Sequence, residues 1–302
     1  SHGGFGRTVS CERLAEIFLE LQAKGARNLN LVTATQWLPW VLPALRGARA
    51  RGLHIPVVYN TGGYERTETV RALAGYVDIW LADLKYAGAE PGAAFSGAAD
   101  YNPVALAAIR QMLAQTGAPR FDGEGYLQRG VILRHLVLPG QVQDSLAVVR
   151  QMADLRRETG VPFLSSFMSQ FTPFYHAARL GLGRRVTTYE YRRVVDAAVD
   201  AGLTEGYMQQ KSSAREEYTP PFDLEGVWRP LPAAPAALDF TVHFVYNFLK
   251  GACSALFRSD AHQKAKRQAP ARLHFQEDFS PCPMPQNTAA PPFFCWPARC
   301  SH

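Results

Sequence analysis

Apolar and polar positions alternate with two different periods along residues 10–210. In residues 10–26, Leu14, Ile17, Phe18 and Leu21 recur three or four positions apart, which predicts an amphipathic helix with Ser10 as its N-cap. A short apolar run at residues 28–33 follows and has the length of a strand. The same alternation predicts further helices at 38–51, 68–74, 103–115, through 146–155 and at 188–201, and further strands at 55–60, 77–84, 131–138, 162–168 and, more weakly, 206–209.

Apolar strands separated by helices are typical of βαβ units built around a parallel sheet, so the predicted fold class is α/β. In such folds, ligands bind at the carboxyl ends of the strands. Each predicted strand here ends in small or polar residues. These ends are Thr33-Ala34-Thr35-Gln36, Asn60-Thr61-Gly62-Gly63, Asp83-Leu84-Lys85, Pro139-Gly140 and Ser169-Gln170.

The character of the chain changes after Trp228. Ten of the 21 prolines but one of the 24 glycines fall in residues 229–302, and the alternation of strands and helices stops there. We therefore predict an α/β domain over residues 1–228. Residues 229–302 are predicted to form a proline-rich, mostly disordered tail, with one peripheral helix near 240–256.

Hydropathy favours a globular protein, and the charge of the chain gives no indication of a nucleic-acid partner. Hydrophobic residues make up 47% and charged residues 19% of the chain. Of the 32 Lys and Arg, 8 lie in residues 229–302 together with 4 of the 26 Asp and Glu, which leaves 24 against 22 in residues 1–228. That excess offers no basic stripe for a nucleic acid. No run of 18 uncharged apolar residues predicts a membrane span.

Cysteine usage indicates a reducing compartment. Cys11 is the single cysteine of residues 1–228, which argues against a disulfide framework and makes a cytoplasmic location the expectation. Cys282, Cys295 and Cys300 have spacings that match neither a zinc ribbon nor an iron–sulfur motif. No metal-ligating residue is therefore expected.

Two charged pairs interrupt the predicted strands. Asp83 and Lys85 share one face at a strand exit, where they could hold a polar ligand or simply form an ion pair that closes the rim of the sheet. Arg134 and His135 are adjacent within an apolar strand, so their side chains must point to opposite faces. We expect Arg134 to point inward, where it needs an anionic or acceptor partner, and His135 outward. A structural salt bridge is the alternative explanation for Arg134.

Read together, the strand ends resemble the radical S-adenosylmethionine (SAM) proteins, and most closely the pyruvate formate-lyase activating enzyme-like group. The resemblance covers about residues 1–226. It is carried in order by Asn28-Leu-Asn-Leu-Val-Thr-Ala-Thr35, Pro56-Val-Val-Tyr-Asn-Thr-Gly-Gly-Tyr64, Val77-Asp-Ile-Trp-Leu-Ala-Asp-Leu-Lys-Tyr86, Phe95-Ser-Gly-Ala-Ala-Asp-Tyr101, Arg134-His-Leu-Val-Leu-Pro-Gly140, Met168-Ser-Gln-Phe-Thr-Pro173 and Tyr218-Thr-Pro-Pro-Phe-Asp223.

The resemblance implies a partial (β/α)₆ barrel that binds SAM across its carboxyl rim. It also implies a 4Fe–4S cluster, held by Cys-x₃-Cys-x₂-Cys after the first strand, whose electron cleaves SAM to a 5′-deoxyadenosyl radical. The implied partners are a glycyl radical enzyme or another protein substrate, and an electron donor such as flavodoxin or ferredoxin.

The resemblance also assigns residues to the SAM site, one position at a time. Thr33, Thr35 and Gln36 stand where the family has a Gly-Gly-Glu segment against the SAM amino group, although the glycines and the acid are absent here. The remaining positions match polar residues at the other strand exits. They are Asn60, Thr61, Asp83, Lys85, Arg134 and Gln170.

The departure from the family is the missing cysteine motif. Ser1-His2-Gly3-Gly4 resembles the stretch that follows the third cysteine, so we expect a barrel that lacks its first strand and cluster loop. The favoured hypothesis is a fragment of a radical SAM enzyme. The alternative is a non-catalytic SAM- or nucleotide-binding barrel that has lost its cluster. A lyase or aldolase with Lys85 as a Schiff-base amine is less favoured, because neighbouring Asp83 would keep that lysine charged.

Overall fold

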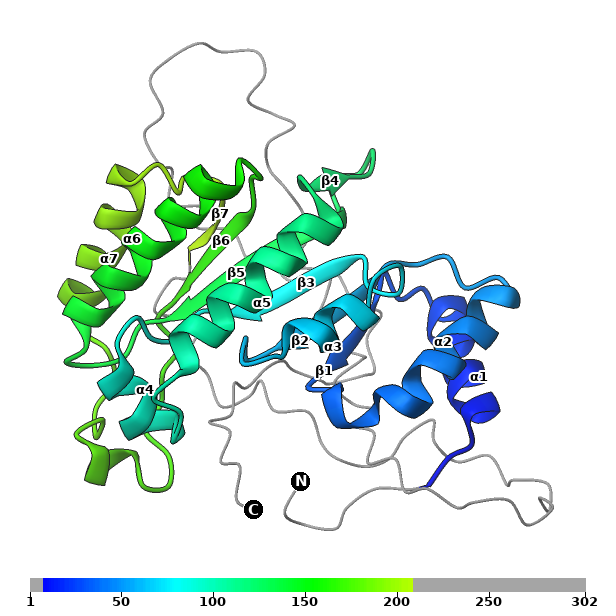
Figure 1. The fold of residues 1–302 in the computed structure, drawn as a ribbon, viewed down its shortest axis with the longest axis horizontal. Coiled ribbons are helices and arrows are strands. Elements are labelled where there is room, and N and C mark those ends of the chain that lie inside the picture. Colours follow the sequence, from blue (N-terminus) through cyan, green and yellow to red (C-terminus); the bar gives the residue numbers. More distant parts are fainter. Residues whose placement is uncertain (1–7, 209–302) are drawn as a thin grey trace, which may run out of the picture.

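The computed structural model describes residues 8–208 (Figure 1). The predicted tail at 229–302, its helix and the boundary at residue 228 lie outside the described residues. So do residues 1–7.

Six parallel strands form one sheet whose spatial order follows the chain. The order is β1-β2-β3-β5-β6-β7, and each strand pairs in parallel with the next. Each new strand is thus added beside the last, as in a (β/α) barrel. The strands are β1 (Leu29–Val32), β2 (Val57–Thr61), β3 (Ile79–Asp83), β5 (Leu127–Leu136), β6 (Leu164–Met168) and β7 (Gly206–Met208). The predicted α/β class and the six predicted strands are confirmed.

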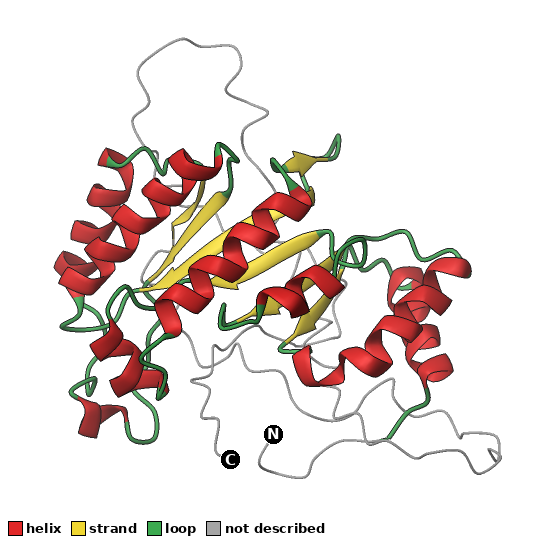
Figure 2. Cartoon of the chain, in the orientation of Figure 1, coloured by secondary structure: helices red, strands yellow, loops and turns green. Residues whose placement is uncertain are grey.

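Except for α1, which precedes β1, each helix lies between two strands along the chain. Figure 2 shows helices crossing in front of the sheet. Ser10 accepts a hydrogen bond from the Arg13 backbone and caps the first helix, as predicted. The helices are α1 (Cys11–Ala23), α2 (Leu38–Ala50), α3 (Thr67–Ala72), α4 (Ala89–Ser96), α5 (Tyr101–Thr116), α6 (Val142–Thr159) and α7 (Thr188–Asp200), with short 3₁₀ turns η1 (Thr35–Trp37) and η2 (Ala177–Leu180).

Three local features differ from the sequence prediction. Helix α5 begins at Tyr101, so Pro103 is its third residue and not its first. Helix α4 was not predicted, because its apolar side chains are mostly alanine and give little periodicity. The two-residue strand β4 (Arg120–Phe121) pairs antiparallel with the start of β5, and so short a strand has no detectable alternation.

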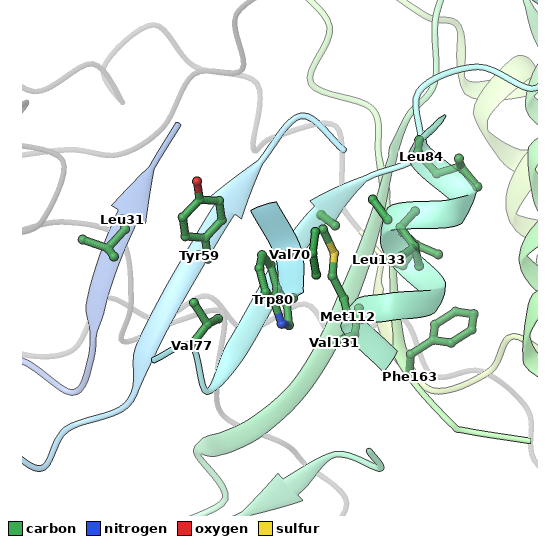
Figure 3. Close-up of a cluster of buried hydrophobic side chains, with 14 of the residues drawn as sticks. Leu31, Tyr59, Val70, Val77, Trp80, Leu84, Met112, Val131, Leu133 and Phe163 are labelled. Carbon is green, nitrogen blue, oxygen red and sulfur yellow. The ribbon is translucent and has the colours of Figure 1, made fainter. Parts of the chain in front are cut away.

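The two faces of the sheet have different surroundings. On one face, Tyr59, Trp80 and Val131 pack with helix residues such as Val70 and Met112 (Figure 3). On the opposite face, a second apolar cluster is formed by Val58, Ile79, Leu81, Leu127, Ile132 and Leu164. We call these the helix face and the inner face. Because side chains alternate along a strand, Asn60, Asp83 and Arg134 belong to the inner face.

Candidate functional site

Three inner-face side chains from three neighbouring strands meet at the carboxyl ends of β2, β3 and β5. The Arg134 Nε donates to Asp83 Oδ1 at 2.7 Å, and Arg134 Nη2 donates to Asn60 Oδ1 at 2.8 Å. The ion pair is well buried, with side-chain exposures of 14% for Arg134 and 5% for Asp83. Among residues 8–208, Nη1 of Arg134 meets no acceptor, so this guanidinium can still bind a ligand oxygen.

His135 points to the helix face, opposite to Arg134. Its Nδ1 lies 2.9 Å from the carbonyl oxygen of Leu84, and its Nε2 lies 2.9 Å from the hydroxyl of Ser145 on α6. Burial lowers the pKa of His135, which favours the neutral imidazole. The prediction that Arg134 and His135 point to opposite faces of the sheet is therefore confirmed. The salt-bridge explanation of Arg134 also holds, since Asp83 is its partner.

Lys85 lies just beyond the end of β3 and reaches toward the exit of β2. A Cβ atom built on Gly62 would lie 3.3 Å from Lys85 Nζ, so the ammonium group rests against the Gly62 backbone. Lys85 and Asp83 thus border the same rim, beside the glycine turn that follows β2.

Thr35 and Thr61 belong to a different cluster, centred on a residue that the sequence analysis did not single out. Their hydroxyls donate to the same oxygen of Glu65, Oε1, at 2.7 and 2.8 Å. Thr35 Oγ1 also lies 2.9 Å from the hydroxyl of Tyr59 on the helix face. Burial raises the pKa of Glu65, against the effect of the two hydroxyl donors. This cluster joins the exits of β1 and β2.

The other predicted site residues are Thr33, Gln36 and Gln170. Thr33 is exposed and has φ 48°, a left-handed conformation that favours glycine. With its amide oriented to satisfy both neighbours, Gln36 donates to the Thr33 carbonyl at 3.1 Å and accepts from Trp37 Nε1 at 3.0 Å. Gln170 Nε2 lies 3.6 Å from Met168 Sδ. The Thr33 backbone amide donates to the carbonyl oxygen of Asn60 at 2.9 Å, so Thr33 reaches the Asn60–Asp83–Arg134 group through its backbone. The bonds of Gln36 and Gln170 given above are to near neighbours in the sequence.

Two more residues border the rim and were missed. Tyr101 on α5 accepts from the Lys85 backbone at 3.0 Å, and its hydroxyl lies 2.8 Å from the Gly62 carbonyl oxygen and 2.9 Å from that of Asp83. The only signal for it was its place in one of the motifs that carry the family resemblance. Ser166 is the β6 residue in register with Arg134. Its alternation with Leu164 within the predicted strand could have placed it on the inner face.

The acidic, amide and cationic groups of this rim fit SAM, whose amino-acid end carries both an ammonium and a carboxylate and whose ribose carries hydroxyls. The residues present do not fit an iron–sulfur cluster. Within residues 8–208, no three His, Cys, Asp or Glu side chains gather where they could hold a metal ion. Cys11, whose thiol lies 3.6 Å from the Trp40 carbonyl oxygen, is a free cysteine. Nor does any helix in this part of the chain have the length and apolar character needed to cross a membrane.

Comparisons with known proteins give weak similarities. No protein-family model matches the chain. The chain is 26% identical over 174 residues to the uncharacterized protein MJ0674 of Methanocaldococcus jannaschii. That match covers 57% of this chain and 46% of the relative, so the chain spans less than half of the relative's length.

Two solved structures are similar to part of this chain at low sequence identity. One is a domain of a pyruvate-formate lyase-activating enzyme from Bacteroides vulgatus, at 14% identity and TM-score 0.44, covering 60% of this chain and 98% of that domain. The other is the FeFe-hydrogenase maturase HydG from Carboxydothermus hydrogenoformans, at 12% identity and TM-score 0.42, covering 66% of this chain and 45% of that protein.

Proposed function

We propose that this chain binds S-adenosylmethionine at the carboxyl ends of β2, β3 and β5 and is part of a radical SAM protein. The observation that carries the proposal is the contact of Arg134 with Asp83 and Asn60. These side chains come from three strands, and each stands at a position where the motifs resemble those of the radical SAM family. Ligands of parallel α/β proteins bind at this end of the sheet.

Opposite charges are placed to hold the two ends of an amino-acid group. Lys85 and Nη1 of Arg134 are suited to a carboxylate, because ammonium and guanidinium groups combine positive charge with N–H donors. Asp83 and Asn60 supply acceptors for an ammonium or a hydroxyl. Burial of the Arg134–Asp83 pair fixes this arrangement before any ligand arrives.

In the family, SAM supplies a 5′-deoxyadenosyl radical when it is bound at a reduced 4Fe–4S cluster. Residues 8–208 hold no ligand set for such a cluster. Activation of a glycyl radical enzyme, and reduction by flavodoxin or ferredoxin, are parts of the proposal supported by the sequence resemblance alone.

A non-catalytic SAM- or nucleotide-binding barrel is the second candidate. Anaerobic reconstitution with iron and sulfide separates the two candidates when it is done on the protein together with whatever the gene encodes upstream of Ser1. Absorbance near about 400 nm with about four irons per chain would support radical chemistry, and a protein of that length that stays iron-free while binding SAM would support the binding protein.

Calorimetric titration of the whole chain with SAM tests the site. Asp83→Asn should weaken binding by roughly 1–3 kcal/mol, because it removes the partner of a buried arginine. Glu158→Gln is the matched control, since it breaks an Arg110–carboxylate pair of 2.8 Å on exposed helix surfaces. His135 would be a poor control because it holds the Leu84 backbone. Equal affinities of wild type and Asp83→Asn would reject this site.

A further inference from the structure

The segment 84–88 between β3 and α4 has no regular secondary structure, yet side chains from other elements hold its backbone at every residue. His135 bonds the carbonyl of Leu84 at 2.9 Å, and Asn102 donates to the carbonyl of Tyr86 at 2.8 Å. The Lys85 amide donates to Tyr101 at 3.0 Å. The amides of Ala87 and Gly88 donate to the carboxylate of Asp144, at 3.1 and 2.8 Å.

These four side chains come from three separate elements. His135 lies on β5, Tyr101 and Asn102 begin α5, and Asp144 lies in the first turn of α6. Tyr101 and His135 are each 2% exposed. Fixing the backbone of one residue costs about 1–2 kcal/mol of conformational entropy, so a loop held at five successive residues is ordered at considerable cost. Lys85 is the charged residue within this ordered loop.

The Lys85 side chain extends from the loop to Gly62. The Gly62 backbone is outside the left-handed region, so conformation does not require glycine at this position. An alanine Cβ would lie 3.3 Å from Lys85 Nζ and 3.7 Å from its Cε, so an added methyl group would push the end of the lysine aside by a few tenths of an ångström. The same Tyr101 hydroxyl that accepts from the Lys85 amide lies 2.8 Å from the carbonyl oxygen of Gly62. One phenol therefore holds both the base of the lysine and the surface against which its ammonium rests.

We propose that Tyr101 and Asp144 are positioning residues that fix the ammonium of Lys85 at the β2 exit, where it binds the carboxylate of the ligand. This inference rests on the proposed function and adds the residues that make Lys85 an anion-binding group. A lysine anchored at its backbone loses less freedom when it binds, so anchoring improves affinity for an anionic group without touching it.

The test compares two ligands that differ in the amino-acid end. Tyr101→Phe keeps the ring but loses the hydroxyl, and it should weaken SAM about tenfold while leaving 5′-methylthioadenosine, which has no carboxylate, unchanged. In a Lys85→Met background, Tyr101→Phe should cause no further loss of SAM affinity. Tyr191→Phe is the control, because it removes a 2.8 Å bond from a buried tyrosine to the backbone of β6, away from segment 84–88.

Two further measurements do not depend on Tyr101. Asp144→Asn should increase amide hydrogen exchange at Ala87 and Gly88 in the protein alone. Gly62→Ala should reduce SAM affinity and spare 5′-methylthioadenosine. Equal losses for both ligands in Tyr101→Phe, with wild-type SAM binding intact, would overturn the inference alone. A wild type that binds neither ligand would overturn the proposed function and this inference together.

Discussion

Gly63 approaches Asp83 so closely that a Cβ atom on Gly63 would lie 2.0 Å from the Asp83 carbonyl oxygen. The turn after β2 therefore packs directly on the backbone at the end of β3. Gly63 itself has a φ of 84°. Both conditions admit glycine alone among the common residues. The contact brings the exits of two strands together beside the candidate site.

Gly63→Ala should be strongly destabilising, by about 3 kcal/mol or more, because backbone strain and a clash add together. Gly52→Ala is its matched control. Gly52 has φ 97° with nothing within 4 Å of a Cβ atom, so it carries the strain without the clash and should cost only about 1–2 kcal/mol. Urea denaturation measures the free energy of unfolding of both variants. Equal losses would mean that the backbone at Gly63 can move away from Asp83 at little cost.

Thr33→Gly should leave stability unchanged or raise it by up to about 1 kcal/mol. The exposed threonine is held at φ 48°, which costs an L-residue about 1–2 kcal/mol, and glycine relieves that cost while adding a smaller entropic one. Thr33→Ala keeps a Cβ atom in the same conformation and should bring no gain. Thermal denaturation distinguishes the two variants. A Thr33→Gly variant less stable than wild type would show that the threonine side chain makes a stabilising contact.

Glu65→Gln should become more stable relative to wild type as pH rises. Burial raises the folded-state pKa of Glu65 above its unfolded value of about 4.3. The stability that this group contributes is therefore full below the unfolded pKa and is lost as pH rises through the folded pKa. Denaturation of both proteins between about pH 4 and 7 should show a difference that grows with pH. A constant difference would place the carboxyl in a solvated environment.

Glu190→Gln should have the opposite pH dependence. The Arg184 guanidinium, with the Thr187 and Gly140 amides, holds the pKa of Glu190 far below its usual value. Its stabilisation is present above the unfolded pKa and is lost as pH falls toward the lowered folded value. The variant should lose about 1 kcal/mol at pH 7, as for other helix caps, and the loss should shrink in acid. A loss that is independent of pH would contradict this ionic role.

The sequence could predict those features that depend on local alternation. The strand exits, and the opposite directions of Arg134 and His135, follow from the period of two along an apolar strand. The cluster around Glu65 could not be found in this way, because Thr35 is 30 residues from Glu65 and neither residue interrupts a periodic run. Asp144 accepts a hydrogen bond from a backbone amide 57 residues away. Every residue except proline has a backbone amide, so the sequence does not show which one Asp144 binds. The left-handed conformation of Thr33 was equally hidden, since threonine rarely adopts it.

The chain order of the parallel strands also has a consequence for biosynthesis. Each strand pairs with the one made just before it, so no strand must wait for a distant later segment or insert between two earlier ones. Asn60, Asp83 and Arg134 are all synthesised by the end of β5, before α6 exists. Asp144 follows on α6 and closes over segment 84–88 last. A nascent chain emerging from the ribosome can thus assemble the charged group first and lock its neighbouring loop afterwards.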